Sequence, residues 1–184
     1  MNMKKIISFF IVACCAMCAT AAKVVWQIGV ADNSGTELAL GPSEYKKFLA
    51  HDFGYEDRYF LVGTSVDKND FPYVLPGPDD TWGGTWSTSG WRTHDANILF
   101  GIKKLPKHGK WKLVVDLVDA NPSRSVVKVM VNSAEKKFEI KGHSKGVLEG
   151  NLQDAKEQIL EFPISANDLK KGGNMVTVSV LEGG

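Results

Sequence analysis

The chain has 184 residues, of which 43% are hydrophobic and 23% are charged, and its formal net charge at pH 7 is +1. These values are typical of one ordinary soluble globular domain. A net charge this small supplies no field for binding a nucleic-acid backbone or an anionic membrane, so nucleic acid is a poor candidate partner.

The first predicted element is an export signal over residues 1–22. The basic stretch MNMKK precedes the apolar run IISFFIVACCAM, which is too short to span a bilayer, and the small residues CATAA follow. We expect cleavage after Ala21 or Ala22. A lipoprotein is the alternative, because IVAC ending at Cys14 also fits the pattern before an acylated cysteine. A strand here is disfavoured, since the run has no amphipathic period and a new alternating segment follows at once.

The cysteines support an exported chain without disulfides. All three, Cys14, Cys15 and Cys18, fall inside the predicted signal, so the domain over residues 23–184 has no thiol. No membrane-spanning segment is expected after the signal is removed. We therefore expect the protein in the periplasm, at the cell surface or outside the cell.

Period-two alternation of apolar residues dominates the rest of the chain, and it predicts short strands. In KWKLVVDLVD, the residues Trp111, Leu113, Val115 and Leu117 share one face, and Asp116 lies on the polar face. The same pattern recurs in segments 24–32, 58–65, 97–104, 125–132, 136–141, 158–165 and 175–182. Such strands predict an all-β, antiparallel β-sandwich, because one apolar face per sheet is buried only when two sheets close on each other.

Two segments have helical character. In residues 42–50, Pro42 suits an early helical position, and Tyr45, Phe48 and Leu49 form an apolar stripe that is expected to pack on the core. The second is the brief segment 165–171. No internal repeat or linker divides residues 23–184, so one domain is expected.

Three segments resemble one family. WQIGVADNSGTELAL, YFLVGTSVDKNDFP and LKKGGNMVTVSV follow each other as in the jelly-roll, carbohydrate-binding-module-like domain of rhamnogalacturonan lyases of the polysaccharide lyase family 4 type. The matching positions are Trp26, Ile28, Gly29, Tyr59, Val62, Gly63, Asp70, Phe71, Pro72, Leu169, Gly173, Asn174, Val176 and Val178. The resemblance implies a galactose-binding-like jelly roll and a plant-type polysaccharide or oligosaccharide as partner.

The resemblance supplies no catalytic residue. In these lyases the catalytic residues lie in a separate N-terminal domain, and similar domains continue into another strand after the equivalent of SVLEGG. This chain is therefore expected to be truncated at its C-terminus, or to be a module of a longer enzyme with a catalytic domain. From their own surroundings, Trp26 and Trp111 are predicted core residues, and Ile28 and Val30 share the face of Trp26. Gly173 with Asn174 predicts a left-handed turn.

The segment PGPDDTWGGTWSTSGWRTH, residues 76–94, is the candidate site. Sugar binding needs flat apolar rings and planar polar groups, and this segment offers them. The predicted carbohydrate-binding residues are Trp82, Trp86, Trp91, Arg92 and His94, with Asp95 beside them. The alternative is a loop whose tryptophans fold back to cap the core.

Other chemistry has little support in the sequence. The acidic pairs Asp79–Asp80 and Glu56–Asp57 could belong to a calcium site or a glycosidase pair, but we interpret them as solvated loop charges. No cofactor is expected. The predicted function is a non-catalytic carbohydrate-binding or accessory module of an exported polysaccharide-degrading system. The alternatives are a fragment of a polysaccharide lyase or glycoside hydrolase, and a structural spacer.

Overall fold

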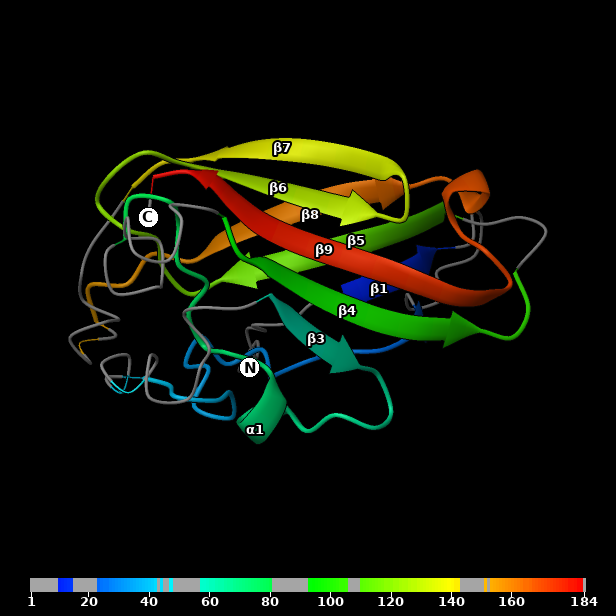
Figure 1. The fold of residues 1–184 in the computed structure, drawn as a ribbon, viewed down its shortest axis with the longest axis horizontal. Coiled ribbons are helices and arrows are strands. Elements are labelled where there is room, and N and C mark those ends of the chain that lie inside the picture. Colours follow the sequence, from blue (N-terminus) through cyan, green and yellow to red (C-terminus); the bar gives the residue numbers. More distant parts are fainter. Residues whose placement is uncertain are drawn as a thin grey trace, which may run out of the picture.

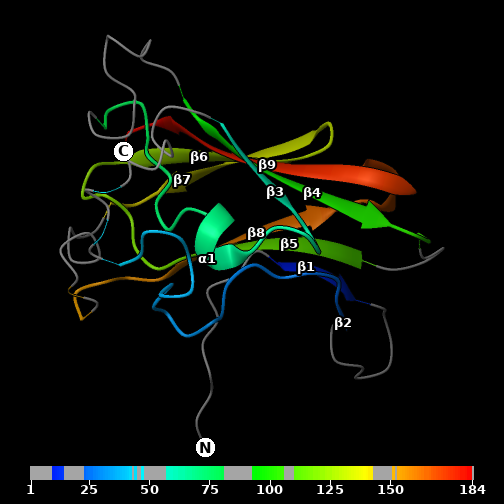
Figure 2. The same ribbon diagram turned by 60° about the horizontal axis from the view of Figure 1, so that its bottom comes forward.

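Two β-sheets packed face to face make up the described part of the chain. The computed structural model describes residues 10–14, 23–42, 44, 47, 57–80, 93–105, 110–142, 151 and 153–183. One sheet has the strand order β2-β1-β5-β8 and the other the order β3-β4-β9-β6-β7 (Figures 1 and 2). The strands are β1 (Phe10–Cys14), β2 (Lys23–Val24), β3 (Arg58–Leu61), β4 (Asp95–Ile102), β5 (Lys110–Leu117), β6 (Ser125–Val131), β7 (Ala134–Ile140), β8 (Gln158–Ile164) and β9 (Gly172–Glu182). The predicted all-β sandwich is confirmed.

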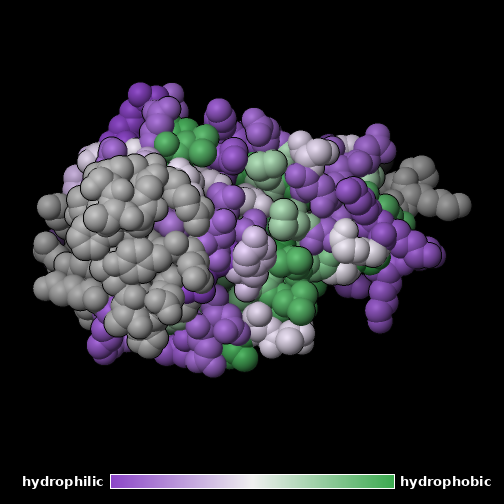
Figure 3. All heavy atoms as spheres, viewed as in Figure 1, coloured by the Kyte–Doolittle hydropathy of each residue, from purple (hydrophilic) through white to green (hydrophobic). Residues whose placement is uncertain are grey.

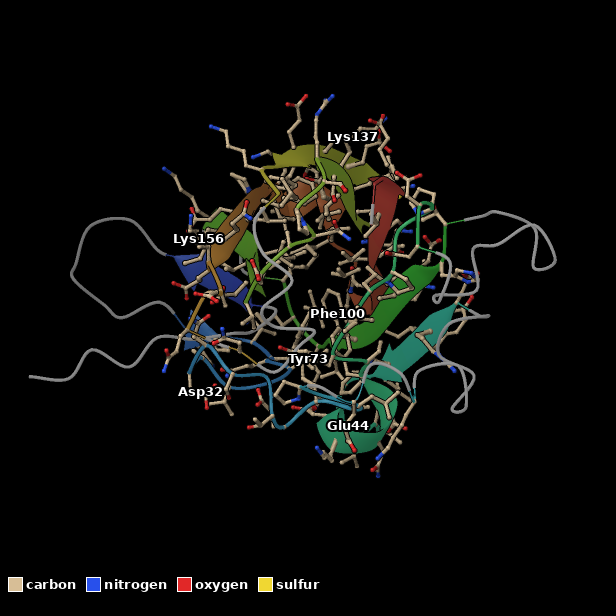
Figure 4. All side chains as sticks on the ribbon, turned by 90° about the vertical axis from the view of Figure 1, so that its left-hand side faces the viewer. Asp32, Glu44, Tyr73, Phe100, Lys137 and Lys156 are labelled. Atoms are coloured by element: carbon tan, nitrogen blue, oxygen red, sulfur yellow. The ribbon has the colours of Figure 1, made fainter. Side chains whose placement is uncertain are left out.

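The core lies between the sheets and follows the predicted alternation. Trp111, Leu113 and Val115 of β5 are buried, and their cross-strand partners in β8 are also buried. The opposite sheet contributes Phe100, whose side chain points into the space between the layers (Figure 4). Its ring centroid lies 5.3 Å from that of Trp26. The prediction that Trp26 and Trp111 are core residues is thus confirmed, and each such burial is worth roughly 1.5–3 kcal/mol.

The strand β1 corrects one expectation about the N-terminal segment. Phe10–Cys14 lies between β2 and β5, with Phe10 opposite Val114 and Cys14 opposite Lys110. The segment lacks an amphipathic period, which disfavours a strand, but backbone pairing requires only an extended segment beside a partner strand. Removal of residues 1–22 as an export signal stays a prediction. In the described ranges, no helix is long and apolar enough to cross a membrane.

The segment 24–32 forms a shorter strand than predicted. Only Lys23–Val24 is a strand, and Gly29 adopts a positive φ of 77°. Its backbone N–H donates to Asp67 Oδ2 at 2.8 Å. Because this conformation interrupts the alternation, Val30 does not join Trp26 and Ile28 in the core and is 53% exposed.

One of the two predicted helices and the direction of one strand pair differ from expectation. Segment 42–50 falls mostly outside the described residues, and segment 165–171 contains only the 3-10 helix Ala166–Asp168, capped by Ser165. A helical turn that was not predicted, α1, spans Asp67–Asp70. The strands β3 and β4 pair in parallel, whereas the other pairs of named strands are antiparallel. A long connection between β3 and β4 permits the parallel pairing.

The Gly173–Asn174 motif has the structural role predicted for it, with the turn one residue earlier. The positive φ of 96° is at Gly172 rather than Gly173. Asn174 is buried, and its Oδ1 accepts from the Lys170 N–H at 2.8 Å and from Asn132 Nδ2 at 3.0 Å. Its Nδ2 donates to the Lys170 carbonyl at 2.8 Å. The amide therefore fastens the start of β9 to the preceding turn and to the β6–β7 turn.

Candidate functional site

The predicted tryptophan-rich loop joins two described stretches that both contact the end of β9. Before the loop, the Asp79 N–H donates to the Gly183 carbonyl at 3.1 Å. After it, Thr93 Oγ1 donates to the Val180 carbonyl at 2.9 Å. These bonds hold both ends of the loop at one corner of the five-stranded sheet. Trp82, Trp86, Trp91 and Arg92 lie outside the described residues, so their roles as carbohydrate contacts stay predictions.

His94 is the one predicted contact residue that the structure describes. It lies immediately before β4 and is 2% exposed. Its place beside a polar loop gave no sign of burial in the sequence. The role of His94 as a ligand contact also stays a prediction.

One carboxylate of each acidic pair accepts a backbone hydrogen bond. Asp80 Oδ2 accepts from the Gly77 N–H at 2.8 Å, and Asp57 Oδ1 accepts from the Asp95 N–H at 3.0 Å. Glu56 lies outside the described residues. Among the residues that the structure describes, no group of three His, Cys, Asp or Glu side chains is arranged to hold a metal ion. These bonds give Asp57 and Asp80 roles at a strand end and in a turn, and Asp80 is buried rather than solvated as we expected.

The outer face of the five-stranded sheet carries an exposed apolar strip. Tyr59 and Leu61 of β3 flank the buried Phe60, and they are 64% and 48% exposed. Leu61 is opposite Leu99, and Leu99 is opposite Met175, which is 38% exposed. Figure 3 shows apolar side chains gathered over β3, β4 and β9, with hydrophilic residues around them. We call Tyr59, Leu61, Leu99, Met130 and Met175 the sheet-face strip.

Buried polar pairs lie on the same outer face beside this strip and link its strands. Thr177 Oγ1 donates to Asn97 Oδ1 at 2.7 Å, and Ser179 Oγ donates to Asp95 Oδ1 at 2.5 Å. Both pairs link β4 to β9 at directly opposed positions. Because buried, satisfied polar pairs fix the relative position of two strands, the strip rests on a rigid support.

A pair of lysines stands at the far end of the same face. Lys128 of β6 is directly opposite Lys137 of β7, and neither forms an ion pair with another described residue. Figure 4 shows Lys137 pointing away from the sandwich. The neighbouring Glu139 is paired with Arg124 at 2.8 Å, and Glu135 is opposite Met130. Like charges directly opposite each other on a sheet are unfavourable, so this pair is suited to an anion.

The strongest described pKa perturbation lies on the other sheet. Asp116 of β5 was expected to face solvent, but it is 8% exposed. Its Oδ1 is buried without a hydrogen-bond partner. Burial is the main cause that raises the pKa of Asp116 to about 7. The negative charge of Glu157 and a hydrogen bond between the Asp116 and Glu157 side chains contribute less. Burial, with smaller contributions from Asp119 and Glu37, also raises the pKa of Tyr73 above its usual value.

The sequence contained a partial signal for the sheet-face strip. Alternation in RYFLVGTS places Tyr59 and Leu61 on one side of the strand and Phe60 on the other. It does not show which side faces the second sheet, nor that Leu99 and Met175 lie beside them. That arrangement depends on the register across three strands.

The comparisons agree with the resemblance found in the sequence. A family model described as CBM-like, domain III of polysaccharide lyase family 4, matches residues 24–183. No curated protein matches the chain. The matched range contains the described parts of both sheets except β1 and Lys23, so the similarity extends over eight of the nine described strands.

Proposed function

Because this chain belongs to the family of CBM-like domains known as domain III of polysaccharide lyase family 4, we propose that it is an accessory carbohydrate-binding module. It acts in an exported polysaccharide-degrading system, and its ligand is a pectin-type glycan such as rhamnogalacturonan. It works alongside a catalytic domain that cleaves the same polysaccharide.

The observation that carries this proposal is the family match over residues 24–183. The surface chemistry of the sandwich supports it. Solvent-facing aromatic and aliphatic side chains on a rigid sheet can cover the C–H face of a sugar ring, and nearby polar groups can bond to its hydroxyls. The sequence of the loop over residues 81–92 offers further rings for the same purpose. Export is supported by the basic, apolar and small-residue order of residues 1–22.

Retention of the purified chain on immobilised pectic glycans tests this function. The parent chain should be retarded on pectin or rhamnogalacturonan and should pass unretarded over a neutral matrix. It should release no unsaturated oligosaccharides when incubated alone with the polysaccharide. Absence of retardation on every plant-type glycan would contradict the binding function, and release of unsaturated products would show that the chain is itself a lyase.

Two variants distinguish a binding loop from a core-capping loop. If Trp82 and Trp86 stack on sugars, Trp82→Ala and Trp86→Ala should each weaken glycan binding by roughly 1–3 kcal/mol while leaving the melting temperature nearly unchanged. If the rings cap the core, the same changes should destabilise the fold by roughly 3–5 kcal/mol. Early unfolding of both variants would contradict the binding role of the loop.

A further inference from the structure

The sheet-face strip is an exposed apolar surface on the described sandwich that the fold does not require. The side chains of Tyr59, Leu61 and Met175 lie on the outer face, while their strand neighbours Phe60, Asn174 and Val176 are buried. Contiguous apolar exposure of this kind, bordered by polar residues, marks interaction sites on soluble proteins. Figure 3 shows the strip open to solvent.

The strip is flat and pre-organised. Tyr59 is opposite Asn97, whose side chain accepts from Thr177, and the end of β3 is fixed by a hydrogen bond from the Leu61 N–H to Ser65 Oγ at 2.9 Å. Next to Leu99 and Met175, Gly101 and Gly173 face each other, and a Cβ at either would meet no atom within 4 Å. The absence of side chains there leaves an open, shallow surface beside the strip, where a ligand can lie close to the backbone.

The charges at the other end of this surface favour an anionic ligand. Lys128 and Lys137 are opposed across β6 and β7, and they form the next pair on the same face after Met130 and Glu135. Glu139 is engaged by Arg124, and Asp95 accepts from Ser179. Glu135 is the other carboxylate on the face of β7 that carries Lys137 and Glu139. Three inter-strand steps of roughly 4.8 Å separate β3, which carries Tyr59, from β6, which carries Lys128. The two strands are therefore about 14 Å apart.

From these observations we infer that the outer face of the five-stranded sheet binds an acidic oligosaccharide laid across the strands. Tyr59 stacks on one sugar ring, Leu61, Leu99 and Met175 contact apolar sugar faces, and Lys128 with Lys137 binds a carboxylate of another sugar. This inference rests on the proposed function but assigns the ligand to a surface separate from the tryptophan-rich loop. Among the described residues of this face, one exposed aromatic ring, a bare backbone surface and two opposed lysines fit a carboxylated glycan better than a close-packed protein partner.

The experiment is a calorimetric titration of the chain with a short oligogalacturonate and with the same oligosaccharide methyl-esterified to remove its charges. Tyr59→Ala should weaken binding of the acidic probe roughly tenfold, within the range expected for loss of one stacking ring. Tyr59→Phe keeps the ring and should bind within about twofold of the parent. Ile159→Ala is the matched control, because Ile159 is also exposed but belongs to β8 in the other sheet. All variants should retain the parental melting temperature.

The lysines are tested separately from the ring. The double variant Lys128→Gln and Lys137→Gln should lose several-fold affinity for the acidic probe, keep its affinity for the esterified probe, and show a weaker salt dependence. Equal losses for both probes would overturn the assignment of the lysines to a carboxylate.

The outcomes separate this inference from the proposed function. If the parent binds the glycan, Tyr59→Ala binds equally well and Trp82→Ala does not, the sheet-face site is wrong and the proposed function stands. If the parent binds no glycan, both fail. Concentration-dependent self-association that Tyr59→Ala abolishes would show instead that this face is a contact between copies of the chain, and would overturn the inference.

Discussion

Replacing Asp116 by asparagine should remove a pH-dependent loss of stability. In the folded chain, burial and the adjacent Glu157 raise the pKa of Asp116 to about 7, compared with the usual value of 3.8. The folded state therefore holds this proton more tightly than the unfolded state does, so the free energy of unfolding falls as pH rises from about 4 to about 7. The amide side chain introduced by Asp116→Asn has nearly the same shape as the carboxyl group and carries no charge at any pH.

The expected change in the free energy of unfolding follows from the shift in the pKa of Asp116. A difference of roughly 3 pKa units corresponds to about 4 kcal/mol at full effect, because one unit is worth about 1.4 kcal/mol. Partial hydration of the pair, and relaxation of Glu157 away from it, reduce this value. We expect the free energy of unfolding of Asp116→Asn to exceed that of the parent by about 2–4 kcal/mol at pH 8, and by much less at pH 4.5.

Urea unfolding of both proteins across this pH range measures the effect. The difference between parent and variant isolates Asp116 from the other titrating groups, and Glu182→Gln, at an exposed carboxylate of β9, is the matched control. Glu157→Gln should flatten the parental pH dependence in the same direction, since it removes the neighbouring charge. If the parental and Asp116→Asn curves run parallel from pH 4.5 to pH 8, the raised pKa assigned to Asp116 is wrong.

Three further predictions concern the core, a turn and the N-terminal segment. Trp111→Ala should lower the free energy of unfolding by roughly 3–5 kcal/mol, because it leaves a cavity between the sheets; a loss below about 1 kcal/mol in chemical unfolding would contradict the assigned packing. Asn174→Ala should cost roughly 1–3 kcal/mol, since it removes the hydrogen bonds that the buried Asn174 side chain forms with the Lys170 N–H and carbonyl. Asn167→Ala, at an exposed position, should leave the thermal midpoint nearly unchanged. Mass spectrometry of exported material should find the chain cleaved near Ala22 or acylated at Cys14, and an intact N-terminus on exported protein would refute this.

The sequence predicts the core of this sandwich well because burial imposes a period of two on each strand. Trp111, Leu113 and Val115 could be assigned to one face without knowing their partners, and their burial confirms this. The same reasoning was wrong for Val30, because the positive φ of Gly29 turns the chain and shifts the following residues. Alternation also cannot distinguish a solvent-facing position from one covered by neighbouring segments, and Asp116 is of the second kind.

The candidate sites could be predicted only in part. The tryptophan-rich loop was recognisable from composition, yet the burial of His94 at its end was not. The sheet-face strip requires knowledge of the order β3-β4-β9-β6, because Tyr59, Leu99 and Met175 are far apart in the sequence. The parallel pairing of β3 with β4, which alternation does not reveal, brings Tyr59 beside Asn97. Long-range register, rather than local pattern, creates this surface.

The pairing of β1 with β5 places export and folding in competition for the same residues. Residues 10–14 can serve as a targeting segment only while they are extended and accessible, yet in the folded chain they are held between β2 and β5. A chain that completes its fold before export would hide its own signal, so translocation must precede folding if the leader works as predicted. Its removal then converts β5 into an edge strand with unpaired backbone groups. The amides of Lys110–Leu117 would accordingly exchange hydrogen faster in the processed protein than in the intact chain.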